Sequence, residues 1–233
     1  DLMSCFDFSM KKKQPLQALP DPRPDAKRAA QIGKQPSPEG PSANFARHQE
    51  PGVRLSRALP YQFDVRDERS DSGIRLRFVS TGTAAAVLHV YDRLDLKRPP
   101  RRYTVAAGAT LVDDWDFHSD AYDLWVLGPN GFHRHFAGSA KDREPVVSWA
   151  FDAKSASLEI SFSEGELVVT PAAYSDKFKP WIAKQPSRHE WALCRNGGWY
   201  DFVLTTPANP DFYRRLAGRL ETGRDSTTDP ARG

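Results

Sequence analysis

Short runs of alternating apolar and polar residues begin at Tyr61 and continue almost to the C-terminus. Between 74 and 80, Ile74, Leu76 and Phe78 alternate with arginines, and this period of two places the apolar side chains on one face of a β-strand. Turn residues separate the runs, and Asn130-Gly131 can adopt the positive φ angles of a tight hairpin. The first set of runs covers 61–65, 74–80, 86–92, 101–107, 110–117, 122–128 and 132–138.

The same pattern starts again after Glu144. Its runs cover 146–152, 156–163, 166–174, 178–184, 189–194, 199–206 and 212–218. Short strands separated by turns at this spacing are typical of a β-sandwich, so we predict an all-β fold with two tandem modules at 61–140 and 144–233.

The two modules also share residues. Tyr122-Asp123 corresponds to Tyr200-Asp201, and each hairpin ends on an Ala-Gly pair, at Gly138 and at Gly218. We expect the aromatic residues to fill the core and the glycines to allow close packing. Further correspondences are Phe132 with Phe212, Trp115 with Trp191 and Tyr91 with Tyr174.

The N-terminal quarter has a different composition. Residues 1–10 form a brief apolar stretch that is too short for a core, and we interpret them as the end of another domain. Residues 11–60 are rich in proline and charge and almost lack aromatics, which is typical of an extended or disordered linker. Part of such a segment can still become ordered by lying across a partner domain.

The charge balance and the cysteines exclude few classes of function. Lys and Arg number 33 against 30 for Asp and Glu, and this net charge of +3 gives little support for nucleic-acid binding. The sequence shows neither an apolar run long enough for a membrane span nor a signal peptide. We interpret Cys5, near the N-terminus, and Cys194, in a predicted strand, as free thiols, although a bridge between them stays open.

Several residues invite a chemical role. His133 and His135 would lie on one face of a strand, as a metal site requires, but a surface pair is the better interpretation because no further ligand has suitable spacing. Asp113, Asp114 and Asp116 could bind calcium, yet a solvated strand or turn fits them better. We find no nucleophile, phosphate-loop or zinc motif, and expect no cofactor, no metal site and no catalytic residue.

The segment 175–184 combines lysines with aromatic residues. This combination suits the interfacial region of a bilayer, and it predicts a lipid-surface contact formed by Lys177, Phe178, Lys179 and Trp181. The alternative is that the two aromatic side chains face inward from a strand while the lysines face solvent.

The C-terminal motifs resemble those of a known family. They are Trp199-Tyr200-Asp201, Ala217-Gly218, Glu221-Thr222-Gly223-Arg224 and Thr228-Asp229-Pro230. Together with the opening "LMSCFDFS" and the tandem modules, they resemble the C-terminal part of the bacterial phosphocholine-specific phospholipases C of hemolytic and non-hemolytic type.

This resemblance implies an accessory role. In that family an α/β phosphoesterase domain precedes a linker and two β-rich repeats, so the catalytic residues would lie outside this chain, which would be inactive alone. The whole enzyme would hydrolyse phosphatidylcholine to diacylglycerol and phosphocholine and would be secreted or periplasmic. The expected partners are the phosphoesterase domain and a phospholipid surface. The alternative function is a stand-alone tandem β-sandwich that binds carbohydrate or protein.

Overall fold

The computed structural model describes residues 20–33, 52–70, 72–141 and 144–232. The chain divides into two compact units at Pro51, and the helix α1 (Arg23–Ala30) lies in the first of them. A proline in its first turn suits a helix start, and no side chain of α1 is buried. No helix among the described residues is long and apolar enough to cross a membrane. The stretch 1–10, with Cys5, lies outside the described residues.

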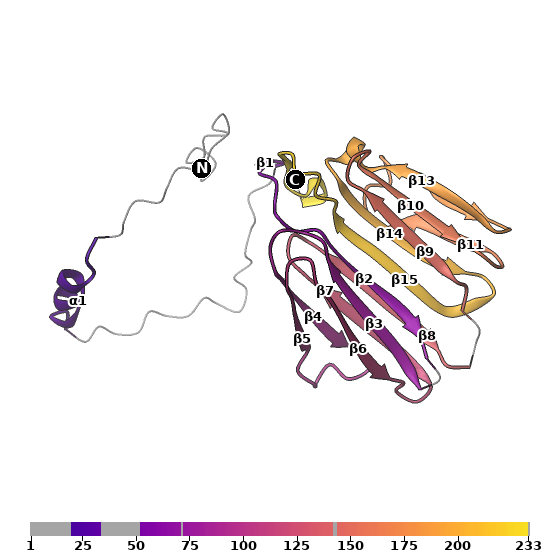
Figure 1. Cartoon of the computed structure of the whole chain (residues 1–233), viewed down its shortest axis with the longest axis horizontal. Helices are drawn as coiled ribbons and strands as arrows, with labels where there is room; N and C mark the ends of the chain where they lie inside the picture. Colours follow the sequence, from indigo (N-terminus) through magenta and orange to yellow (C-terminus); the bar gives the residue numbers. More distant parts are fainter. Residues whose placement is uncertain (1–19, 34–51, 71, 142–143, 233) are drawn as a thin grey trace. The chain divides into compact units, whose positions relative to one another are not determined.

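The second unit, from Gly52 onward, is built from strands (Figure 1). The first module contains β2 (Phe63–Arg69), β3 (Gly73–Ser80), β4 (Ala86–Asp92), β5 (Arg101–Val105), β6 (Thr110–Asp116), β7 (Ala121–Leu127) and β8 (His133–Ser139). The second contains β9 (Val147–Asp152), β10 (Ser157–Phe162), β11 (Leu167–Pro171), β12 (Trp181–Ala183), β13 (Ser187–Ala192), β14 (Trp199–Thr206) and β15 (Asn209–Arg219). The all-β prediction is therefore confirmed.

The end of the predicted linker joins the C-terminal tail. Strand β1 (Leu55–Ser56) pairs with β16 (Ser226–Thr227), and the short 3-10 helix η3 (Pro230–Arg232) follows. The Leu59 amide also donates to Glu221, at 3.1 Å. Within the predicted linker 11–60, the described residues thus include one helix and one paired strand.

The two modules share one sheet. It has eight antiparallel strands in the order β12-β11-β14-β15-β8-β7-β4-β5. Each module adds a three-stranded sheet, β2-β3-β6 or β13-β10-β9. Side chains that alternate along the large sheet, such as Leu124, Phe136, Phe202 and Leu216, are fully or almost fully buried, so one face of this sheet is covered along both modules.

The modules join where β8 pairs with β15. In this pairing His135 lies opposite Arg215, and these two residues occupy equivalent positions in the repeat. A pseudo-twofold axis therefore passes between them. The outer edges of the large sheet are β5, which follows Pro99-Pro100, and β12, which has three residues and follows Pro180.

Three details of the sequence prediction can now be judged. Asn130 and Gly131 have φ angles of 55° and 71°, which confirms the tight hairpin. Cys194 is exposed and lies in the 3-10 helix η2 (Leu193–Asn196), so its assignment to a strand is wrong; glycines with positive φ follow and end that segment. The bridge to Cys5 is not tested, because Cys5 is not described.

Of the predicted matches of Trp115 with Trp191 and of Tyr91 with Tyr174, the first fits the strand registers and the second does not. Trp115 pairs with β3 as Trp191 pairs with β10, so this match fits the strand registers. The match of Tyr91 with Tyr174 is wrong. In the first module, Tyr91 lies opposite Trp125. Trp125 corresponds to Val203 in the second module, and Val203 lies opposite Thr170. The strand register therefore makes Thr170 the equivalent of Tyr91.

Candidate functional site

Two arginines on the inner face of β8 and β15 occupy the junction between the modules. The side chain of Arg134 is fully buried, and it crosses into the second module. Its guanidinium donates to the Ala217 carbonyl and to the Tyr200 hydroxyl, each at 3.0 Å. Asp64 on β2 supplies the carboxylate, also at 3.0 Å.

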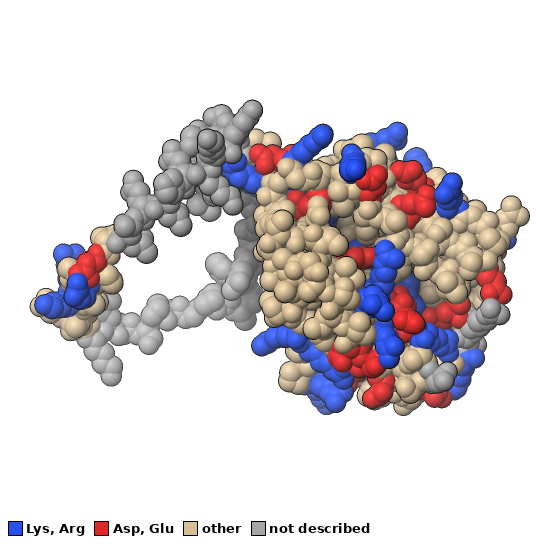
Figure 2. All heavy atoms as spheres, viewed as in Figure 1, with Lys and Arg blue, Asp and Glu red and all other residues tan. Residues whose placement is uncertain are grey.

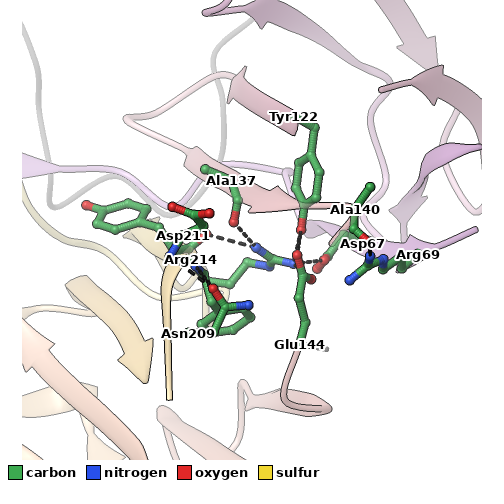
Figure 3. Close-up of polar contacts among 11 residues, drawn as sticks. Asp67, Arg69, Tyr122, Ala137, Ala140, Glu144, Asn209, Asp211 and Arg214 are labelled. Atoms are coloured by element: carbon green, nitrogen blue, oxygen red, sulfur yellow. Dashed lines mark hydrogen bonds and ion pairs between the residues drawn. The ribbon is translucent and has the colours of Figure 1, made fainter. Parts of the chain in front are cut away.

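Arg214 makes the equivalent contacts in the opposite direction (Figure 3). Its guanidinium donates to the Ala137 carbonyl at 2.7 Å and to the Tyr122 hydroxyl at 2.6 Å, both in the first module. Asp67 and Glu144 supply two carboxylates, at 2.6 and 2.8 Å. Each arginine therefore binds the partner module through one carbonyl and one tyrosine.

The repeated Tyr and Gly residues make these reciprocal arginine contacts possible. Tyr122 lies opposite Gly138 and Tyr200 lies opposite Gly218 in the strand pairs. A Cβ atom on Gly138 would lie 1.9 Å from Glu144 Oε1 and 2.6 Å from the Tyr122 hydroxyl. Only glycine leaves room there for the phenol and its hydrogen bond.

The charge states agree with these contacts. Burial lowers the pKa of Arg134, but Tyr200 and Asp64 outweigh it, so the pKa is raised and the guanidinium stays charged. Burial raises the pKa of Tyr122. The phenol therefore keeps its proton, which it donates to Glu144 Oε1 at 2.6 Å while its oxygen accepts from Arg214.

Two cavities lie at the junction of the modules, and Arg214 lines the second of them. The first, of about 470 Å³, is lined by Tyr61, Phe63 and Phe132 of one module and by Phe151 and Tyr200 of the other. The second, of about 590 Å³, is lined by Asp67, Glu144, Trp149 and Arg214 among others. Figure 2 shows a band of cationic and anionic side chains between two mainly uncharged areas of the surface.

The predicted histidine pair lies on the outer face of the large sheet. Its rings lie 6.2 Å apart and share this face, as the spacing predicts. The surface interpretation is wrong for His135, however, because this side chain is buried and its Nε2 lies 2.6 Å from an Asp123 oxygen. Among the described residues, no group of three or more His, Cys, Asp or Glu side chains is placed to hold a metal ion.

The predicted acidic cluster lies on the exposed strand β6. Asp114 forms an ion pair with Arg75 at 2.8 Å, and Asp113 forms one with Arg101 at the same distance. Asp116 is exposed. The solvated-strand interpretation agrees with this placement.

The predicted lipid-contact residues do not share one exposed surface. Lys177 and Lys179 are exposed, whereas Phe178 is buried and its ring lies 5.2 Å from that of Phe202. Trp181 is half-buried beside the rings of Phe162, His189 and Trp191. For Phe178 the structure follows the inward-facing alternative.

Sequence reasoning missed the two arginines. The signal was present, because Phe-x-Arg occurs at the same place in both hairpins, as Phe132-x-Arg134 and Phe212-x-Arg214. The Arg134 guanidinium carbon lies 4.2 Å from the centre of the Phe132 ring, and that of Arg214 lies 4.6 Å from the centre of the Phe212 ring.

We predict that Arg134→Met and Arg214→Met each lower the free energy of unfolding by about 3–5 kcal/mol, because each leaves buried polar groups without their partner. Urea denaturation measures this loss. Arg75→Met, which removes an exposed ion pair, is the control and should leave the midpoint nearly unchanged. Equal effects of all three variants would contradict the structural role of the buried pair.

His133 should give the protein a specific pH dependence. Burial, followed by the charge of Arg215, lowers the pKa of His133 from 6.5 to about 4. The unfolded chain then takes up this proton near pH 6.5 while the folded protein does not, so stability decreases as the pH falls from 6.5 to 4. An NMR titration of the histidine rings should show this low pKa.

The stability effect has its own control. The variant His133→Gln should lose part of the pH dependence of the urea midpoint, whereas His118→Gln, at an exposed site, should retain it. Titration of His133 near 6.5 would contradict the burial that we describe.

Comparison with known proteins identifies the first module. Residues 55–139 match the family model described as bacterial phospholipase C, C-terminal domain. This match ends at the last residue of β8, and the second module repeats the same order of strands.

Three relatives align with nearly the whole chain. The non-hemolytic phospholipase C of Pseudomonas aeruginosa is 35% identical over 254 residues, which cover 100% of this chain and 36% of the relative. The non-hemolytic phospholipase C of Burkholderia pseudomallei is 35% identical over 99% of this chain and 35% of its own length. The hemolytic phospholipase C of Pseudomonas aeruginosa is 32% identical over 99% of this chain and 37% of its own length.

The chain thus spans about a third of the length of the curated relatives it matches. Its strand order, its repeated hairpin motif and these similarities agree with one another. The chain therefore belongs to the bacterial phospholipase C family, of which it carries the C-terminal domain.

Proposed function

We propose that this chain is the accessory region of a phospholipase C that hydrolyses phosphatidylcholine to diacylglycerol and phosphocholine. The observation that carries this proposal is the alignment, in which the whole chain matches only about a third of each relative. The remaining two thirds leave room for a phosphoesterase domain, which we propose as the partner of this region. We further propose that the enzyme is secreted or periplasmic.

The ion pairs of the carboxylates at the junction support a structural role. Asp64, Asp67 and Glu144 each accept hydrogen bonds from a buried arginine, and Asp201 binds Arg215 at 2.6 Å. Groups that neutralise internal cations hold the modules together and are poorly available for acid–base chemistry.

The alternative of a stand-alone carbohydrate-binding module is not favoured. Such a function would be supported by a line of exposed tryptophans. Instead Trp115, Trp191 and Trp199 are buried, and Trp181 is half-buried.

Lipid contact stays a proposal, and two loops compete for it. The predicted segment runs from the β11–β12 loop into β12, and the symmetry-related counterpart of this loop connects β4 to β5. The β4–β5 loop exposes Leu94 by 45% and Leu96 by 61%, next to exposed Lys97 and Arg98. Apolar side chains flanked by cations suit a bilayer surface. The two loops lie at opposite edges of the large sheet, so we treat them as alternatives.

The accessory role predicts a defect in the shortened enzyme. A phospholipase that carries this chain but lacks residues 61–233 should lose stability or lose hydrolysis of phosphatidylcholine vesicles, because its supporting region is gone. Thermal unfolding and phosphocholine release measure these two effects. This chain alone should release no phosphocholine. Unchanged stability and activity in the shortened enzyme, or turnover by the repurified chain, would contradict the proposal.

Vesicle co-sedimentation of this chain decides between the two loops. With vesicles of phosphatidylcholine mixed with phosphatidylglycerol, the double variant Leu94→Ser and Leu96→Ser should bind about tenfold less, because two apolar side chains no longer enter the interface. Leu111→Ser, at another exposed leucine, is the control. A loss confined to Lys177→Gln with Lys179→Gln would instead favour the predicted segment, and wild-type binding by all variants would remove both loops.

A further inference from the structure

We propose that the cavity of about 470 Å³ between the modules, called here the junction cavity, binds an amphiphilic anion. This is a molecule with a phosphate or carboxylate group attached to an apolar body. The inference concerns a site separate from the two loops, and it does not depend on the accessory role. It follows from the hydrogen-bonding capacity that the lining residues leave unused.

The carboxylates of the junction cavity are already occupied. Asp64 accepts from Arg134 on one oxygen, and its other oxygen accepts from Arg66 and from the Trp149 indole. Glu221 accepts from the Asn130 amide at 2.8 Å and from the Leu59 amide at 3.1 Å, and it forms an ion pair with Arg219. Neither carboxylate is left to attract a cation.

The arginine N–H donors of the junction cavity, in contrast, do not all have acceptors among the described residues. Arg77 lines the cavity and is exposed, and it has no hydrogen-bond or ion-pair partner within the part of the chain that the structure describes. Arg66 uses Nε and Nη2 for Asp64 and the Trp149 carbonyl, which leaves Nη1. The Nε of Arg219, whose side chain is 2% exposed, is buried without a partner among these residues.

The two exposed arginines also repel each other. Arg66 on β2 lies directly opposite Arg77 on β3, and like charges at such a position destabilise a strand pair. An anion between the two guanidinium groups would relieve this repulsion. Arginine pairs are well suited to phosphate or carboxylate oxygens, because guanidinium presents parallel donors.

Aromatic side chains form much of the remaining wall of the junction cavity, together with the polar residues Gln62, Thr81 and Asn130. Tyr61, Phe63 and Phe132 form a cluster in which the rings of Phe63 and Phe132 lie 4.6 Å apart. Phe151 and Tyr200 line the cavity from the second module. The volume lies in the range of small-molecule sites. The cavity thus offers cationic donors together with aromatic walls, which matches both parts of an amphiphilic anion.

NMR titration of this chain with hexyl phosphate tests the proposal. Hexyl phosphate should bind at least about tenfold more tightly than inorganic phosphate or hexanol, because each of these carries only one part of the ligand. The amide signals of residues 61–66 and 130–132 should shift. Equal binding of hexyl phosphate and hexanol would overturn the proposal.

Substitutions connect this binding to the cavity. Arg77→Gln should weaken hexyl phosphate binding about tenfold without lowering the thermal midpoint, because Arg77 is exposed, holds no other group and repels Arg66. Arg102→Gln, at an exposed arginine on β5 away from the cavity, is the control and should bind as the wild type does. Identical affinities of the two variants would overturn the proposal.

A final titration identifies the source of the anion. Monomeric dihexanoylphosphatidylcholine that binds, and that binds more weakly to Arg77→Gln, would assign the site to a phospholipid molecule. Binding of hexyl phosphate without binding of this lipid would assign it to a free amphiphilic phosphate or carboxylate. Either result supports an anion site at Arg66 and Arg77.

Discussion

The reciprocal exchange of Arg134 and Arg214 across the β8–β15 pair is the interaction on which the second unit depends. A guanidinium is costly to remove from water, and here two of them lie under the same covered face of one sheet. Each is stabilised by a carbonyl and a tyrosine of the other module. Neither module could bury its own arginine in this way without its neighbour.

The same cluster explains the shape of the junction. The edge strands β2 and β9 approach each other above the arginines, and their contact is made by side chains, such as Arg66 with the Trp149 carbonyl and Trp149 with Asp64. Since polar groups and aromatic rings occupy this gap instead of a continuous strand ladder, cavities remain beside it. The packing that joins the modules thereby also produces these two cavities.

The strands could be predicted from the sequence, because a period of two and the turn residues are local signals. The hairpin at Asn130-Gly131 is one example. The shared sheet could not be predicted in the same way. An arginine at an inward position of a strand looks like a solvent-facing residue, and its partners are distant, with Asp64 70 residues from Arg134 and Asp67 147 residues from Arg214.

The candidate site also could not be predicted from local sequence signals. Lys177, Phe178 and Lys179 form a basic aromatic segment in the sequence, but the fold turns Phe178 into the core. The junction cavity combines β2, β3, the β7–β8 turn and the end of β15, so no single segment carries its pattern. Arg66 and Arg77 are eleven residues apart in number, and only the strand register makes them neighbours.

The pseudo-twofold axis between His135 and Arg215 also fixes how many modules the array can contain. A contact in which equivalent edges meet is isologous. It closes after two copies, because β8 and β15, the equivalent edges of the two modules, are then paired with each other. The edges of the large sheet that remain are β5, which follows two prolines, and β12, which has three residues and follows one proline. Short, proline-flanked edges do not template a further strand. Unlike a solenoid, which can grow by adding repeats, this architecture is complete as a pair.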